Sequence, residues 1–194
     1  MDEANTFGNT FEKALEYALV KHKGQYRKFS NIPYLWHPIS VAKNVEQNKT
    51  SKNLELLLTA AILHDTVEDC EEVTIEEIAK IFGYKVAALV DELTSDKDQI
   101  EIMGKTEYLK QKMEKMSSYA LVLKLSDRLD NIIDIAQRPK EFQEKYTKET
   151  IEIIKHLESC GRKLSETHKK LILKIKTSFF NQKLVKDVVT LEMM

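Results

Sequence analysis

The run LELLLTAAILHD, residues 54–65, is the strongest constraint on how this chain folds. On a helix it is apolar on nearly every side, so other elements have to surround it. With only five glycines and three prolines in 194 residues, and with abundant Lys, Glu and Leu, the composition favours helices over turn-rich sheets. We therefore expect an all-α, single-domain fold in which this helix runs through the core.

Other segments also show helical periodicity, and short motifs mark some of their ends. An amphipathic helix is predicted over Thr10 to Lys23, and a short one over Pro38 to Glu46, with Pro38 in its first turn. Thr74 and Glu77 have the spacing of a capping box, and Gly83 supplies a stop. Further helices are predicted over residues 84–93, 106–115 and 118–136 and within 141–168, whereas residues 24–37 and 94–105 are expected to be loops.

Charge and cysteine usage exclude several classes of partner. The formal net charge is −1, from 30 basic and 31 acidic residues, so we expect no nucleic-acid partner. The N-terminus lacks the pattern of a signal peptide, and no apolar run reaches the roughly 20 residues of a membrane span, so we expect a cytoplasmic protein without a membrane partner. Cys70 and Cys160 lie far apart and outside any C-x-x-C pattern, which predicts reduced cysteines and neither a disulfide nor a cysteine zinc site.

The segment HDTVED, from His64 to Asp69, places five polar residues at the end of the apolar helix. Burying so many ionisable groups is costly without a compensating partner. On a continuous helix His64 and Glu68 are four residues apart, as are Asp65 and Asp69, so these side chains gather near one end. A divalent cation would compensate them, while the simpler alternative is a helix cap followed by exposed charge.

Two other positions extend this candidate metal site. His37 lies in PYLWHP, where a hydrogen-bonded structural histidine is the alternative, and Asp127 lies where the apolar LVLKL segment turns acidic. With His64 and Asp65 they form a mixed imidazole and carboxylate set suited to Mn²⁺, Fe²⁺ or Zn²⁺. Such a cation activates water for attack on phosphorus. Glu68 and Asp69 are candidates to orient or deprotonate that water, and Asn131, one turn after Asp127, is a candidate substrate contact.

Longer motifs resemble those of the small alarmone hydrolases, stand-alone versions of the hydrolase domain of RelA/SpoT enzymes. The similar motifs occur in the order and at nearly the spacing found in that family, over roughly residues 10–160. They are GQYRK, PYLWHP, AAILHDTVED, IFG followed by VAALVDELTSDK, and KLSDRLDNI.

The resemblance implies a helical HD-type domain over residues 1–167. The tail, residues 168–194, is predicted from its own pattern to be a helical extension that packs on the body or on a partner subunit in a homo-oligomer, with a membrane-surface helix as the alternative. Its apolar residues recur at mostly helical intervals: Leu171, Ile172, Ile175, Phe179, Phe180, Leu184 and Val188.

The resemblance also implies hydrolysis of a small nucleotide, ppGpp or pppGpp, to GDP or GTP and pyrophosphate, as in the stringent response. The residues that match functional positions of the family are His37, His64, Asp65 and Asp127 for Mn²⁺, Glu68 and Asp69 for catalysis, and Arg27, Lys28, Asn131 and Lys97 for substrate.

Some positions depart from the family pattern, and alternatives remain open. The segment FSNI after Lys28 lacks the glycine that is common there, and Ser126 and Asp130 replace the usual alanine and histidine around Asp127. No synthetase region follows, so we expect degradation of alarmone and not its synthesis. Hydrolysis of pppApp-type nucleotides or of the 2′-phosphate of NADPH, a non-catalytic nucleotide-binding module and a helical scaffold are the alternatives. A solvated basic run is the alternative for Arg27 and Lys28, and a solvated loop lysine for Lys97.

Overall fold

The computed structural model describes residues 7–182, and the side-chain environments from residue 10 onward. Among these residues no extended strand occurs, and one isolated bridge joins Tyr26 to Pro33, which confirms the all-α class. The chain divides into two units, Met1–Ser95 and Asp96–Met194. In the part of the chain that the structure describes, no helix has the length and apolar character needed to cross a membrane.

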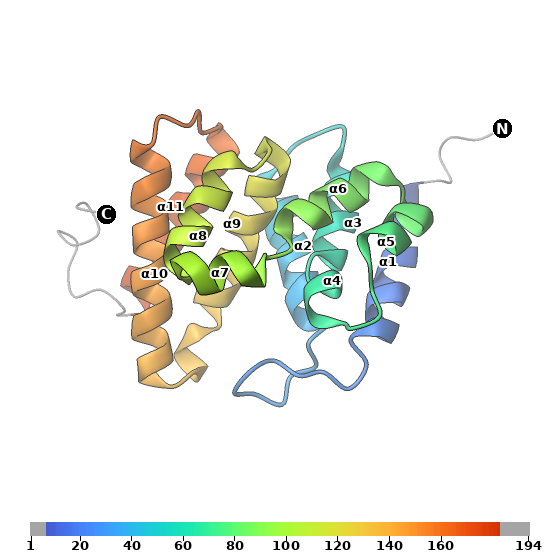
Figure 1. Ribbon diagram of the computed structural model, residues 1–194, viewed down its shortest axis with the longest axis horizontal. Coiled ribbons are helices and arrows are strands. Elements are labelled where there is room, and N and C mark those ends of the chain that lie inside the picture. Colours follow the sequence, from blue (N-terminus) through green and yellow to red (C-terminus); the bar gives the residue numbers. More distant parts are fainter. Residues whose placement is uncertain (1–6, 183–194) are drawn as a thin grey trace. The chain divides into compact units, whose positions relative to one another are not determined.

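The first unit is built around α3 (Leu54–Leu63), the apolar run identified in the sequence. Leu57 and residues 59–63 are fully buried, because α3 packs against three other helices, α1, α2 and α6 (Figure 1). The prediction of a helix through the core is confirmed. The other helices of this unit are α1 (Phe7–Lys21), α2 (Trp36–Asn48), α4 (Thr66–Asp69), α5 (Ile75–Phe82) and α6 (Tyr84–Leu93).

The predicted start and stop of α5 are both present, with one difference. The Thr74 side chain accepts a hydrogen bond from the Glu77 backbone N–H at 3.2 Å, and Gly83 ends the helix with a positive φ of 87°. The Glu77 carboxylate does not complete the capping box. It accepts a hydrogen bond from Tyr17 at 2.8 Å and pairs with Lys21 at 3.3 Å, so it ties α5 to α1 instead.

The second unit contains a helix where a loop was expected. Its helices are α7 (Lys97–Met103), α8 (Lys105–Lys115), α9 (Ser118–Ile133), the 3₁₀ turn η2 (Ile135–Gln137), α10 (Lys140–Ser159) and α11 (Glu166–Asn181). The prediction of a loop over residues 94–105 is therefore wrong for residues 97–103, which form α7. The Asp96 side chain caps α7 by accepting from the Gln99 N–H at 3.0 Å, and Gly104 ends the helix with φ of 82°.

A buried ion pair joins α9 to α10 within the second unit. The Arg128 guanidinium donates to Glu149 at 2.7 Å and to Thr150 at 2.6 Å, and it lies 5.2 Å from the centre of the Tyr146 ring. Arg128 follows Asp127 directly, so this anchor fixes the part of α9 that carries the acidic motif.

The C-terminal helix α11 begins at a capping box formed by Ser165 and His168 and packs against α9. Its buried apolar residues are Leu171, Ile172, Ile175 and Phe179, at the helical spacing noted in the sequence. The predicted boundary at residue 168 falls inside this helix, so no break in secondary structure separates the two proposed parts. Leu184 and Val188, which extend the predicted apolar pattern, lie outside the described residues.

Candidate active site

The acidic motif lies at a break between two helices and not on one continuous helix. His64 caps the C-terminus of α3, Asp65 caps the N-terminus of α4, and both keep helical backbone angles. Two side chains form hydrogen bonds to backbone carbonyls at the end of α3. His64 Nδ1 bonds the Ala61 carbonyl at 2.8 Å, and the Thr66 hydroxyl donates to the Leu63 carbonyl at 2.7 Å. Such side-chain bonds compete with the helical ladder, which explains the interruption.

The break brings both predicted histidines against the first carboxylate. Nε2 of His64 lies 3.0 Å from Asp65 Oδ2, and Nε2 of His37, near the start of α2, lies 3.5 Å from the same oxygen. The two imidazole rings are 5.1 Å apart, centre to centre, and both histidines are buried. Within the first unit, the structure therefore brings together three of the four residues predicted to bind metal.

The donor atoms of this cluster suit a cation. Because Nδ1 of His64 bonds a backbone carbonyl, Nε2 is the nitrogen left facing Asp65. This Nε2 is buried and makes no hydrogen bond to any of the described residues. A histidine that ligates a metal usually has this arrangement: one ring nitrogen bonds a backbone carbonyl, which orients the ring, and the other nitrogen binds the ion.

The charge balance of the cluster favours an ionised carboxylate. Burial by itself would raise the pKa of Asp65, but the adjacent His64 and His37 imidazoles outweigh it and hold that pKa well below its ordinary value. An anionic Asp65 is the form that binds a divalent cation.

Tyr34 contacts the same oxygen of Asp65 as the two histidines, and the sequence did not single out this residue. Its hydroxyl donates to Asp65 Oδ2 at 2.5 Å, and its ring makes edge contact with His37, 5.7 Å away. Burial, followed by the charges of Asp65 and Asp69, raises the pKa of the Tyr34 hydroxyl, so this group remains a donor. Its place three residues before His37 in PYLWHP was the available signal, but the motif does not tell which aromatic residue turns inward.

Residues that follow α1 support the same region and were also missed. His22 Nδ1 lies 2.7 Å from the side-chain oxygen of Gln25, whose amide donates to the backbone carbonyl of Asp69 at 2.9 Å. The His22 ring is buried and lies 4.9 Å from the Tyr34 ring. Gln25 belongs to the GQYRK motif, whereas no sequence signal marked His22.

The predicted catalytic pair follows on α4. Glu68 Oε2 accepts a hydrogen bond from the Ser95 backbone N–H at 3.0 Å, which fixes the carboxylate against the residue that ends this unit. Partial desolvation, followed by the charges of Asp65 and Glu68, raises the pKa of Asp69. Glu68 and Asp69 follow Asp65, a candidate metal ligand, by three and four residues, about one helical turn.

The fourth predicted ligand, Asp127, lies on α9 in the second unit. Its carboxylate accepts from Asn131 Nδ2 at 2.6 Å and pairs with Lys124 at 3.0 Å. The Asn131 side-chain oxygen in turn accepts from Arg138 at 3.3 Å. The structure thus joins Asp127 and Asn131, two predicted site residues, in one hydrogen-bonded group.

The remaining predicted substrate contacts lie in loops or at a helix start. Arg27 is buried and Lys28 is exposed, in a loop closed by the Tyr26–Pro33 bridge. Phe29 adopts a positive φ of 67°, a conformation that glycine takes without strain, at the segment where the family commonly has glycine. Lys97 is the exposed first residue of α7.

We expect Tyr34→Phe to weaken metal binding without unfolding the site. The ring contacts stay, but the hydrogen bond that orients Asp65 is lost. Loss of such an outer partner costs about 10–100-fold in metal affinity or activity. A titration of activity with Mn²⁺ checks this: the half-saturating concentration should rise for Tyr34→Phe and stay the same for Tyr26→Phe, a control at an exposed tyrosine of the same loop. Unchanged Mn²⁺ dependence in Tyr34→Phe would contradict the role given to its hydroxyl.

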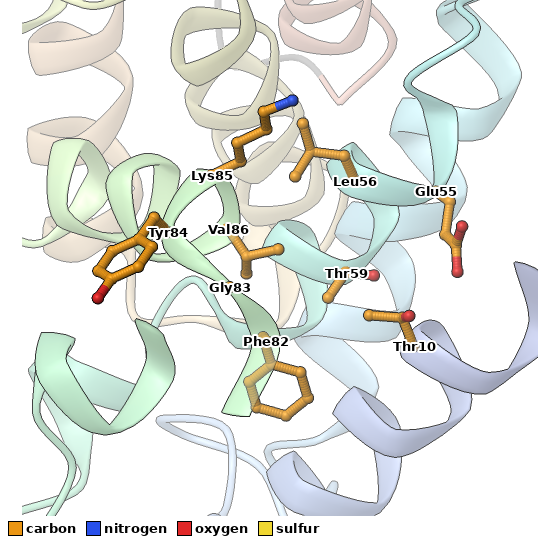
Figure 2. Close-up of a pocket in the computed structure, with 9 residues that line it drawn as sticks. All are labelled: Thr10, Glu55, Leu56, Thr59, Phe82, Gly83, Tyr84, Lys85 and Val86. Atoms are coloured by element: carbon orange, nitrogen blue, oxygen red, sulfur yellow. The ribbon is translucent and has the colours of Figure 1, made fainter. Parts of the chain in front are cut away.

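A pocket of about 470 Å³ in the first unit lies elsewhere on the surface (Figure 2). None of the predicted site residues lines it. Its lining comes from α1, α3 and the junction of α5 and α6 and consists of Thr10, Glu55, Leu56, Thr59, Phe82, Gly83, Tyr84, Lys85 and Val86. The histidine and carboxylate cluster is therefore distinct from this pocket.

Comparisons with known proteins agree with this geometry. The HD domain family matches residues 14–162. The human guanosine-3′,5′-bis(diphosphate) 3′-pyrophosphohydrolase MESH1 is 34% identical over 165 residues, covering 82% of this chain and 90% of its own, and the mouse protein of the same name is 33% identical with the same coverage.

A solved structure, described as a metazoan orthologue of SpoT that hydrolyses ppGpp, superposes with a TM-score of 0.75 at 31% identity. It covers 91% of this chain and 97% of its own. The resemblance inferred from the motifs is confirmed. The chain belongs to the HD domain family and, within it, to the small hydrolases related to MESH1.

Proposed function

We propose that this protein is a metal-dependent 3′-pyrophosphohydrolase that converts ppGpp or pppGpp to GDP or GTP and pyrophosphate. The observation that carries the proposal is the buried Nε2 of His64, which lacks a hydrogen bond among the described residues and faces Asp65 beside His37. The similarity to MESH1, which extends over 82% of the chain, supplies the substrate class.

His37, His64, Asp65 and Asp127 are the proposed ligands, and Mn²⁺ is the proposed ion. Two imidazoles and two carboxylates suit Mn²⁺ and leave further coordination positions for solvent and substrate. When bound, the ion supplies Lewis acidity toward the phosphoryl oxygens and toward the attacking water. Asp127 is held for this role by Asn131 and Lys124.

The two carboxylates of α4 provide the proton transfer in this proposal. Glu68 or Asp69 accepts the proton of the water whose oxygen attacks the phosphorus attached to the ribose 3′-oxygen. The bond between that phosphorus and the 3′-oxygen breaks, the 3′-oxygen takes up a proton, and pyrophosphate leaves with the oxygen of water. The Ser95 N–H, 3.0 Å from Glu68, keeps that side chain in one orientation during the reaction.

Four further residues are proposed as substrate contacts. Arg27 and Lys28 flank the nucleotide base, since a guanidinium stacks on a purine face and an ammonium meets a carbonyl or phosphate oxygen. Asn131 contacts the substrate beside Asp127, and Lys97 lies on the phosphate side. We also propose the division into a hydrolase domain, residues 1–167, and a C-terminal extension, residues 168–194. The cytoplasmic location, the homo-oligomer and the lack of a nucleic-acid partner stay predictions.

A comparison of substrates tests the proposal. The protein is incubated with ppGpp, pppApp or NADPH, each with Mn²⁺ and with EDTA. We expect ppGpp to be consumed fastest, only with the metal, and with release of pyrophosphate. Preferential consumption of pppApp, or release of orthophosphate from NADPH, would assign the site to the alternative substrates. No turnover of any of the three in the presence of bound metal would overturn the proposal and favour a binding module.

A further inference from the structure

A second group of metal-binding side chains lies in the second unit and takes no part in the proposed hydrolysis. Glu114 lies in the last turn of α8, His156 in the last turn of α10, and Cys160 caps the end of α10. One donor atom of each residue lies within 4.8 Å of the donor atoms of the other two. We call these three residues the α8–α10 cluster. His156 Nε2 and Glu114 Oε2 are already 2.6 Å apart.

The donor set of this cluster differs from that of the proposed active site. It combines a sulfur, an imidazole nitrogen and a carboxylate oxygen, whereas the active site offers only nitrogen and oxygen. A soft thiolate ligand selects Zn²⁺ over Mn²⁺ and Mg²⁺. Three protein ligands with a fourth position for water match the tetrahedral preference of Zn²⁺. The prediction of no cysteine zinc site rested on the absence of a C-x-x-C pattern. The lack of that pattern does not exclude a site in which one cysteine combines with a histidine and a glutamate.

The surroundings add one favourable and one opposing effect. The cluster gathers at the C-termini of α8 and α10, where the helix dipoles present partial negative charge to a cation. Arg162 opposes this in part, because its guanidinium donates to the carbonyls of Met113 and Glu114 at the end of α8. The three side chains are half-buried, so an ion from solvent can reach them without unfolding of the unit.

We propose that the α8–α10 cluster is a second metal site that binds Zn²⁺ through Glu114, His156 and Cys160. The ion takes the place of the proton shared by Glu114 and His156 and adds the Cys160 sulfur, so it links the end of α8 to the end of α10. Binding to the folded state alone would stabilise the second unit by mass action. In this proposal the ion acts on the stability of the second unit and needs no substrate to bind.

Cobalt substitution tests this site separately from the active site. Co²⁺ bound to a thiolate gives a ligand-to-metal charge-transfer band in the near ultraviolet, and the proposed active-site ligands include no thiolate. We expect the band in the full chain and in Cys70→Ser, which removes the other cysteine, and its loss in Cys160→Ser. We also expect Asp65→Asn to keep the band, because it changes only the hydrolytic site.

A second measurement keeps the test decisive if Cys160→Ser folds poorly. His156→Gln keeps the thiol but removes the imidazole. It is compared in the Asp65→Asn background, where Zn²⁺ no longer binds at the proposed active site, and there it should lose the rise in Tm that Zn²⁺ gives Asp65→Asn alone. The proposal is overturned if the protein shows no thiolate band with Co²⁺, if Cys160→Ser keeps the band, or if Cys70→Ser loses it. Hydrolysis of ppGpp by the same preparations is measured in parallel, so failure of this site and failure of the proposed function give different results.

Discussion

Asp65→Asn is expected to lower kcat/KM for ppGpp hydrolysis by at least about 10³-fold, equivalent to roughly 4 kcal/mol of transition-state stabilisation. Both histidines and Tyr34 contact the Asp65 carboxylate, and asparagine has nearly its shape without its charge. A bound metal supplies several kcal/mol of charge stabilisation, which is lost if the ion no longer binds. Steady-state kinetics at saturating Mn²⁺, combined with Mn²⁺ binding measured by calorimetry, check this.

The matched control is Asp91→Asn, which removes an exposed carboxylate of α6 in the same unit. It should leave the kinetics and the Mn²⁺ affinity unchanged, and circular dichroism should show that both variants keep their helices. If Asp65→Asn binds Mn²⁺ as the unsubstituted protein does and retains activity within tenfold, Asp65 is not a ligand.

Substitution of the acidic pair is expected to have the next largest effect and a different signature. Glu68→Gln and Asp69→Asn should each lower kcat by about 10²–10⁴-fold, the range that a positioned acid or base contributes. Mn²⁺ affinity should change little, because neither residue is a proposed ligand. The measurement is kcat at saturating Mn²⁺ and ppGpp, together with the Mn²⁺ titration.

Glu72→Gln, at an exposed residue just after α4, is the control and should keep full activity. If both Glu68→Gln and Asp69→Asn retained kcat within a few-fold, the proton would have to be taken by another group, and the catalytic assignment would fail. A variant that lost Mn²⁺ binding together with activity would instead place that carboxylate among the ligands.

The helices were largely predictable because their apolar periodicity is strong and their ends carry recognisable residues. The apolar run of α3 and the cap at Thr74 are both where the sequence predicts them. The helix α7 was missed because none of its seven residues is buried, so it lacks an apolar stripe. The sequence signal for α7 was a pair of end markers, the Asp96 cap and the Gly104 stop. Such markers are local and do not depend on periodicity.

The candidate site was predictable by residue type and less so by arrangement. Costly ionisable residues after an apolar helix identified His64 and Asp65, but the break between α3 and α4 depends on side-chain hydrogen bonds that a periodic pattern does not encode. Tyr34 and His22 were missed because an aromatic or imidazole ring beside a site differs from one in the core only by its contacts. Those contacts join segments distant in the sequence, such as Tyr34 and Asp65.

The measurement that tests the central claim most directly is ³¹P NMR of the products formed from ppGpp with Mn²⁺ in ¹⁸O-labelled water. Attack of water on the phosphorus attached to the 3′-oxygen predicts GDP and pyrophosphate, with the label in pyrophosphate alone. Release of orthophosphate, or label in the 3′-hydroxyl of GDP, would contradict the account, because either result requires a different bond to break.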